Sequence, residues 1–285
     1  LWGLFKKIVI ADNCATYANL IFNNYTEYSG SALFLGAFFF TIQIYCDFSG
    51  YSSIAIGTAR LFGFNLSKNF SFPYFSRNFA EVWRKWHISL TTWFRDYLFI
   101  PLVRSSKINT YTKIRNLFIL FITIGLWHGA NWTYVLWGVS QAILFIPTVL
   151  IKRKNKIIDI VAEGKYLPSL KDFFLMIKTF LLTILTMVIF RAKNINDAIE
   201  YLSGIFSFSL FTFPDNVFGR NGLITFLIVL VFMLIEWFGR ENKYAIEKIG
   251  VKWYRPLRWC FYSFLIFTIG LFMKTDELPF IYFNF

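Results

Sequence analysis

The stretch that decides the fold is LFILFITIGLWHGANWTYVLWG, residues 117–138, in which His128 stands between two apolar runs. About 20 apolar residues are enough for a helix to cross a bilayer, and a break at Gly129-Ala-Asn131 interrupts this sequence. We therefore expect a helical hairpin with arms at 117–126 and 132–150. An ionisable side chain at membrane depth is costly, and such a residue usually faces a cavity or a bundle interior and marks function.

The composition of the whole chain agrees with a membrane protein. Of its 285 residues, 56% are hydrophobic and 22% aromatic, with 37 Phe, whereas an average soluble domain is about 45–50% apolar even with Gly counted. A soluble domain of this size cannot bury that many phenylalanines. We expect an all-α polytopic membrane protein, with one membrane domain over 1–285. Further spans are expected at 32–61, 173–190, 222–238 and 257–273.

The charge is strongly positive, with 29 Lys and Arg against 16 Asp and Glu. In a soluble protein this excess would suggest nucleic acid. Here basic loops that hold the cytoplasmic side and meet anionic lipid explain it better, so we expect membrane lipids and no nucleic acid as partners. The basic segments 65–115, 152–171 and 239–258 then share the cytoplasmic side, and 192–221 faces out.

Metal and disulfide chemistry have little support in the sequence. His87 and His128 form no HxxH or HxxxH pair, so we predict no metal site. The three cysteines, Cys14, Cys46 and Cys260, contain no CxxC pair. They are interpreted as small buried residues.

The segment 65–115 is too polar to face lipid and too aromatic for a solvated loop, which favours a re-entrant or interfacial helical region. If 83–97 is helical, Arg84, His87 and Thr91 share one face, and a neighbouring face carries Trp86, Trp93 and Tyr97. The alternative is an interfacial aromatic belt with snorkelling basic residues, among them Arg95. A belt explains Trp and Arg but does not require His87.

Two intramembrane polar groups are candidates for chemistry. A buried imidazole at His128 has a lowered pKa and, when neutral, accepts a proton from a hydroxyl, while Asn131 orients a carbonyl. The alternative is a histidine that only bonds a neighbouring helix. Asp47, inside an apolar run, needs a partner such as an arginine, and a purely structural ion pair between helices explains it as well.

Blocks in order along the chain resemble the membrane-bound O-acyltransferase family, in its bacterial branch of alginate and peptidoglycan O-acetylation and teichoic-acid D-alanylation proteins. The blocks are LWGLFKKIVIAD at 1–12, YCDFSGY at 45–51, NFSFPY at 69–74, 83–97, WHG at 127–129, FRA at 190–192 and FIYFNF at 280–285. One departure is Ile100-Pro-Leu-Val-Arg-Ser105, where alginate-type sequences continue with two glycines. The polymer is therefore not identified by the resemblance.

The resemblance implies a multi-helix ring around a tunnel with re-entrant segments, of which this chain is the C-terminal part of a longer protein. It implies that His128 is the catalytic histidine and His87 the second functional one. Trp127, Asn131, Trp86, Arg84, Arg95 and Asp47 are expected to bind substrate or shape the tunnel.

The expected function is acyl transfer, most simply of acetyl from acetyl-CoA with no bound cofactor, in a multi-pass protein of the bacterial inner membrane. The acceptor is an extracytoplasmic polysaccharide, reached directly or through a secreted or membrane-anchored SGNH-type acetyltransferase. Two alternatives stay open: D-alanyl transfer to teichoic acid by the same fold, and a transporter of acyl carriers or lipids that performs no chemistry.

Overall fold

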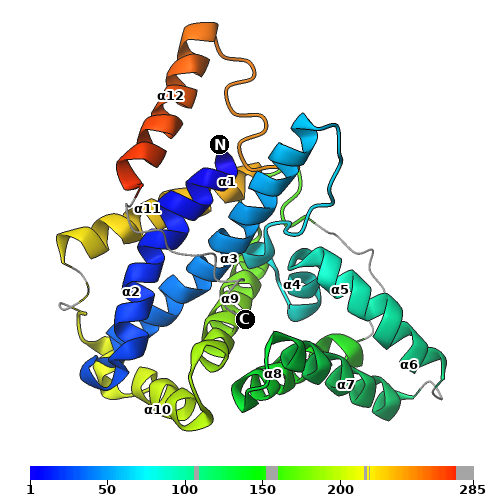
Figure 1. Cartoon of the computed structure of the whole chain (residues 1–285). Helices are drawn as coiled ribbons and strands as arrows, with labels where there is room; N and C mark the ends of the chain where they lie inside the picture. Colours follow the sequence, from blue (N-terminus) through cyan, green and yellow to red (C-terminus); the bar gives the residue numbers. More distant parts are fainter. Residues whose placement is uncertain (106–108, 152–159, 215–216, 218, 274–285) are drawn as a thin grey trace. The chain divides into compact units, whose positions relative to one another are not determined.

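The computed structural model describes residues 1–105, 109–151, 160–214, 217 and 219–273. These residues form helices and no strands, which confirms the all-α class. The chain divides into two compact units, Leu1–Lys68 with Gly204–Phe285, and Asn69–Ser203. They are called the first and second unit below, and Figure 1 shows the helices of each. A single membrane domain over the whole chain stays a prediction. Residues 152–159 of the expected basic segment 152–171, and the block 280–285, lie outside the described residues.

The first unit is built on one long helix, against which the N-terminal helices pack. Its backbones approach closely where glycines meet, since a Cβ at Gly3 would lie 2.7 Å from the carbonyl oxygen of Gly50. Small residues permit such contact between membrane helices. The elements of this unit are α1 (Trp2–Leu4), the π-helical η1 (Phe5–Ala11), α2 (Asp12–Asn23), η2 (Tyr25–Glu27), α3 (Gly30–Leu61), η5 (Phe208–Phe211), α11 (Arg220–Gly239) and α12 (Arg255–Phe272).

The second unit contains a helical hairpin, α7 and α8, with α9 packed beside α8. The hairpin is tight because a Cβ on Gly125 would collide with the carbonyl of Tyr134, and one on Gly138 with that of Phe121. The elements are η3 (Pro73–Phe75), α4 (Phe79–Lys85), α5 (Ile88–Phe94), the π-helical η4 (Arg95–Phe99), α6 (Ile100–Arg104), α7 (Thr110–His128), α8 (Trp132–Leu150), α9 (Leu170–Arg191) and most of α10 (Ile195–Ile205).

Four helices, α3, α8, α9 and α11, are long and apolar enough to cross a membrane. They match the spans expected at 32–61, 132–150, 173–190 and 222–238, and the protein is a multi-pass membrane protein. The fifth expected span, 257–273, forms α12 but is not among these four, because the arginines of that helix lower its mean hydropathy. The arm expected at 117–126 is longer than predicted, since a capping box of Asn109 and Thr112 starts α7 at Thr110.

Asp47 is buried on α3 and is held by a lysine, whereas the sequence suggested an arginine. The Nζ atom of Lys7 lies 2.8 Å from Asp47 Oδ1 and 2.8 Å from Asp12 Oδ1. A second buried acid, Glu236 on α11, accepts hydrogen bonds from Tyr45 Oη at 2.6 Å and Trp2 Nε1 at 3.3 Å. These interactions join α1, α3 and α11 within the first unit.

The cysteines follow the expectation in part. Cys14 and Cys46 are fully buried in the first unit, but Cys260 is exposed on α12. The expectation that all three are buried is therefore wrong for Cys260.

Candidate functional site

His128 is the last residue of α7, at the point where the hairpin turns. The helix ends there because Gly129 adopts φ 151°, a conformation that favours glycine. A Cβ on Gly129 would also lie 2.8 Å from the ring of Tyr134. The chain then reverses into α8, whose N-cap is Asn131. The side chain of His128 is buried, with the residue only 8% exposed.

Aromatic rings surround the imidazole of His128. The distances between ring centroids are 4.9 Å to Trp127, 5.1 Å to Phe190, 5.5 Å to Trp137 and 6.3 Å to Tyr134. We call these four residues the aromatic box. They come from α7, α8 and α9, so three helices of the second unit meet at His128. The box makes the surroundings of the imidazole apolar.

His87 is buried at a break between α4 and α5, where its backbone has φ 41°. A residue other than glycine rarely adopts this left-handed conformation, which is enriched at functional sites. The break corrects the expectation of one helix over 83–97 that presents Arg84, His87 and Thr91 on one face. Its cause is non-local: the backbone of 69–71 bonds to the break, with Ile88 N donating to Asn69 O at 2.9 Å and Ser71 N to Lys85 O at 3.0 Å.

Both histidines contact the ring of Trp127. The Trp127 ring centroid is 6.1 Å from that of His87 and 4.9 Å from that of His128. The segment of His87 therefore folds back against the hairpin. Trp83 supports this arrangement from α4, because its Nε1 donates to Gln141 Oε1 at 3.3 Å and its ring lies 5.0 Å from that of Phe121.

Burial controls the ionisation of both imidazoles, which lie outside the four candidate spans. It lowers the pKa of His87 to about 4. Burial, with a smaller contribution from the nearby His87, lowers the pKa of His128 to about 3. Both side chains are therefore neutral at pH 7, the form in which an imidazole nitrogen accepts a proton.

The other predicted site residues lie in different surroundings. Asn131 caps α8 through Thr133 N at 3.0 Å, and its Nδ2 donates to Lys193 O at 2.9 Å. Trp86 packs on Phe70, at 5.1 Å between centroids. Arg84 is exposed, and Arg95 is an exposed partner of Asp96 at 2.8 Å. Asp47 belongs to the first unit.

Sequence reasoning did not single out Tyr134, Trp137 and Phe190, although all three contact His128. Tyr134 and Trp137 are one helical turn apart on α8, a spacing that places them on one face. In an apolar helix this spacing is equally typical of residues that face lipid or a helix core. Only the block FRA at 190–192 contained one of them.

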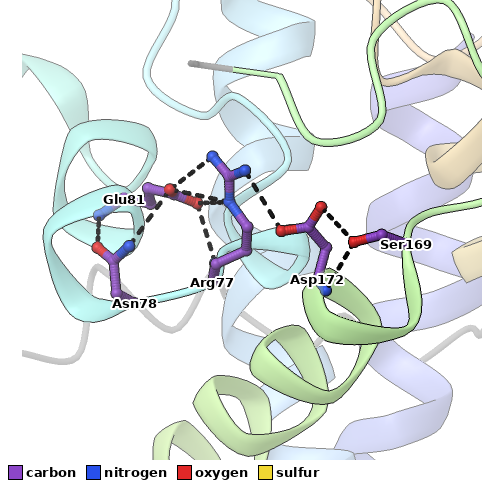
Figure 2. Close-up of polar contacts among 5 residues, drawn as sticks. All are labelled: Arg77, Asn78, Glu81, Ser169 and Asp172. Atoms are coloured by element: carbon purple, nitrogen blue, oxygen red, sulfur yellow. Dashed lines mark hydrogen bonds and ion pairs between the residues drawn. The ribbon is translucent and has the colours of Figure 1, made fainter. Parts of the chain in front are cut away.

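A partly buried ion cluster connects the start of α4 to the start of α9 (Figure 2). Arg77 Nη2 and Nε lie 2.8 and 3.0 Å from Glu81 Oε1, and Arg77 Nη1 lies 3.5 Å from Asp172 Oδ1. Asn78 and Ser169 are the N-caps of the two helices. The helix α4 leads to His87, and α9 carries Phe190, which contacts His128. The cluster therefore connects the helix that precedes one histidine to a helix that packs against the other.

This chain matches one family model and several known proteins. The family model of the membrane-bound O-acyltransferase family matches residues 4–190. The chain is 35% identical over 301 residues to "Probable alginate O-acetylase AlgI" of Pseudomonas putida, covering 99% of this chain and 59% of that protein. It is 30% identical over 302 residues to "Peptidoglycan O-acetyltransferase" of Helicobacter pylori, covering 99% and 55%.

A further relative is "Teichoic acid D-alanyltransferase" of Bacillus subtilis, 30% identical over 175 residues, with 59% of this chain and 42% of that protein covered. Almost the whole chain is matched by the two O-acetylation relatives, but it spans little more than half of their length. Both histidines and all four residues of the aromatic box fall within the range matched by the family model. The chain belongs to the membrane-bound O-acyltransferase family.

Proposed function

We propose that the full-length protein transfers an acetyl group from acetyl-CoA to an acceptor hydroxyl, in a reaction that leads to acetylation of an extracytoplasmic polysaccharide. The acceptor hydroxyl belongs either to the polymer or to a secreted or membrane-anchored SGNH-type enzyme that modifies it. The protein acts in the bacterial plasma membrane, with the donor on the cytoplasmic side. The family, and relatives named as O-acetylating enzymes that match 99% of the chain, support this proposal.

The observation that carries the proposal is the pair of buried imidazoles, His87 and His128, both in contact with the ring of Trp127. In the proposed reaction, a neutral His128 takes the proton of the acceptor hydroxyl as its oxygen attacks the acyl carbonyl carbon. The carbon–sulfur bond of the thioester then breaks, and the imidazolium returns the proton to the thiolate. His87 assists on the donor or acceptor side. A positioned general base of this kind contributes about 10²–10⁴-fold to a rate.

Acetyl transfer is favoured over D-alanyl transfer by the extent of the similarity. The two O-acetylation relatives match 99% of the chain, whereas the D-alanyltransferase of Bacillus subtilis matches 59%. The two activities differ in donor, so they are separated by offering the purified protein each acyl donor in turn.

The test replaces His128 in the full-length protein, in membranes supplied with labelled acetyl-CoA and the acceptor polymer. His128→Ala should lower the rate of acetylation by about 10²–10⁴-fold. His128→Gln is the matched variant, because an amide of similar length accepts no proton at neutral pH, and it should be equally inactive. The amount of protein in the membrane and its unfolding midpoint are the controls. Full acetylation by either variant would contradict the assignment.

A transporter without chemistry predicts a different outcome. In detergent it would give no acetylated product from labelled donor, even with an acceptor and partner present. In vesicles, the label would still cross the membrane. Product formation in detergent, where no compartment exists, therefore excludes this alternative.

A further inference from the structure

Two buried hydrogen-bond donors beside His128 have no partner within the described residues. They are the indole Nε1–H of Trp137 and the hydroxyl of Thr133, both on α8. The two residues are 3% and 1% exposed. A buried donor without a partner costs free energy, so nearly all buried donors in native proteins are hydrogen-bonded.

Comparable side chains in the same chain are satisfied. Trp83 Nε1 donates to Gln141 Oε1 at 3.3 Å. Thr179 and Thr183 on α9 each donate to a helix carbonyl at 2.8 Å. Trp137 and Thr133 therefore differ from these other Trp and Thr side chains of the second unit, whose donors are hydrogen-bonded. The indole has no acceptor atom, so only an acceptor such as a carbonyl oxygen satisfies Trp137.

Both donors lie at the proposed base. Trp137 belongs to the aromatic box, its ring 5.5 Å from the His128 ring at an interplanar angle of 87°. Thr133 precedes it by one helical turn, and residues four apart share a helix face. The neighbour of Thr133 along the chain, Tyr134, contacts His128 as well. The face of α8 that borders the imidazole thus presents two unused donors in apolar surroundings.

We infer that Trp137 and Thr133 donate hydrogen bonds to the acyl carbonyl oxygen during transfer. This inference rests on the proposed function. When the acceptor oxygen attacks the carbonyl carbon, the carbon–oxygen double bond becomes a single bond and its oxygen gains the negative charge. The two donors stabilise this oxyanion until the carbonyl re-forms and the thiolate leaves with the proton held by His128. Donors in a site shielded from water are most effective here, because no solvent has to reorganise.

The same geometry explains why these donors are unpaired within the part of the chain that the structure describes. A polar partner from the fold would compete with the acyl group for them. The hydroxyl of Tyr134 is the only side-chain oxygen of the aromatic box, and neither donor bonds to it, so both donors are left to the substrate. The apolar walls also fit a small acyl group without charge.

The test is a set of substitutions in the full-length protein that remove one donor each and keep the shape. Trp137→Phe should lower kcat by about a hundredfold or more, the effect typical of one oxyanion donor, with little change in KM for the acyl donor. Thr133→Val should lower kcat in the same way, and Thr133→Ser, which restores the hydroxyl, should recover it. The unfolding midpoint of each variant should stay near that of the wild type.

Matched controls are available within the same unit. Trp83→Phe and Thr183→Val remove donors of the same chemistry that bond to protein atoms, so both should lower the unfolding midpoint. Thr183 lies outside the aromatic box and does not support the histidines, so Thr183→Val should also leave kcat within a few-fold of wild type. If Trp137→Phe instead lowers the midpoint as Trp83→Phe does and keeps its kcat, the indole is structural and the inference is wrong. If the wild type transfers no more acetyl than His128→Ala, the proposed function itself fails. An active wild type with an equally active Trp137→Phe overturns only the inference.

Discussion

Two groups of buried polar side chains, one in each compact unit, differ in how they are satisfied. In the first unit the buried groups around Asp47 carry charge and meet opposite charge or strong donors, as Lys7 does with Asp47 and Asp12. In the second unit the buried groups at the hairpin turn are neutral imidazoles enclosed by aromatic rings. A paired charge within a bundle fixes how helices pack, whereas an imidazole in an apolar box stays neutral at pH 7 and keeps an unprotonated nitrogen.

This difference indicates which substitutions act on the fold and which on the chemistry. Removing one member of a buried ion pair leaves the other charge uncompensated and is strongly destabilising. Removing an imidazole from an aromatic box leaves no charge behind, so its effect appears in the rate. Substitutions of buried charged groups should therefore lower the free energy of unfolding, and substitutions of the imidazoles should lower the rate.

The largest effect on stability is expected at Asp47. Asp47→Ala leaves Lys7 buried with Asp12 as its remaining carboxylate, so the free energy of unfolding should fall by about 3 kcal/mol. The unfolding midpoint of the detergent-solubilised protein measures this loss. Asp12→Ala is the matched variant, and it should cost less because the side chain of Asp12 is 17% exposed and that of Asp47 is 3% exposed.

A double substitution makes the same comparison sharper. Replacing Lys7 with Met and Asp47 with Leu removes both charges, and this variant should be more stable than Asp47→Ala alone. If the single variant is as stable as the wild type, the pair does not hold the first unit together.

A smaller effect is expected in the ion cluster of Figure 2. Arg77→Lys keeps the charge but loses the fork that meets Glu81, so it should lower the free energy of unfolding by about 1–2 kcal/mol. Asp172→Asn should cost less, since its contact with Arg77 is longer, 3.5 Å against 2.8 Å, and its side chain is more exposed. Thermal unfolding measures both variants, and equal losses would show that Glu81 is not the principal partner.

The sequence predicted those parts of the fold that depend on local pattern. The apolar runs at 32–61, 173–190 and 222–238 became α3, α9 and α11, because length and hydropathy are properties of each segment alone. The break at His87 was not predicted, since it depends on backbone bonds from Asn69 and Ser71. Asp47 was expected to have a partner such as an arginine, but its partner is Lys7, which lies on a separate helical segment and so could not be identified from the pattern around Asp47.

The candidate site was predictable at its centre and not at its walls. His128 is conspicuous in the sequence because an ionisable residue interrupts an apolar run. Trp137 and Phe190 look like ordinary apolar residues of a helix, and only the packing of α7, α8 and α9 shows that they enclose an imidazole. The acyl-transfer hypothesis came from the family resemblance and not from periodicity.

The smallest effect, close to none, is expected when the pH is lowered. For an imidazole with an ordinary pKa near 6.5, the neutral fraction would fall about tenfold between pH 7.5 and pH 5.5. Because burial lowers the pKa of His87 to about 4 and that of His128 to about 3, both bases should stay neutral there. The rate of acetyl transfer by the detergent-solubilised protein should therefore change less than about twofold between pH 7.5 and 5.5 and fall only as the pH approaches 4. A decline with its midpoint near pH 6.5 would show that water reaches the imidazole and that the aromatic box does not exclude it.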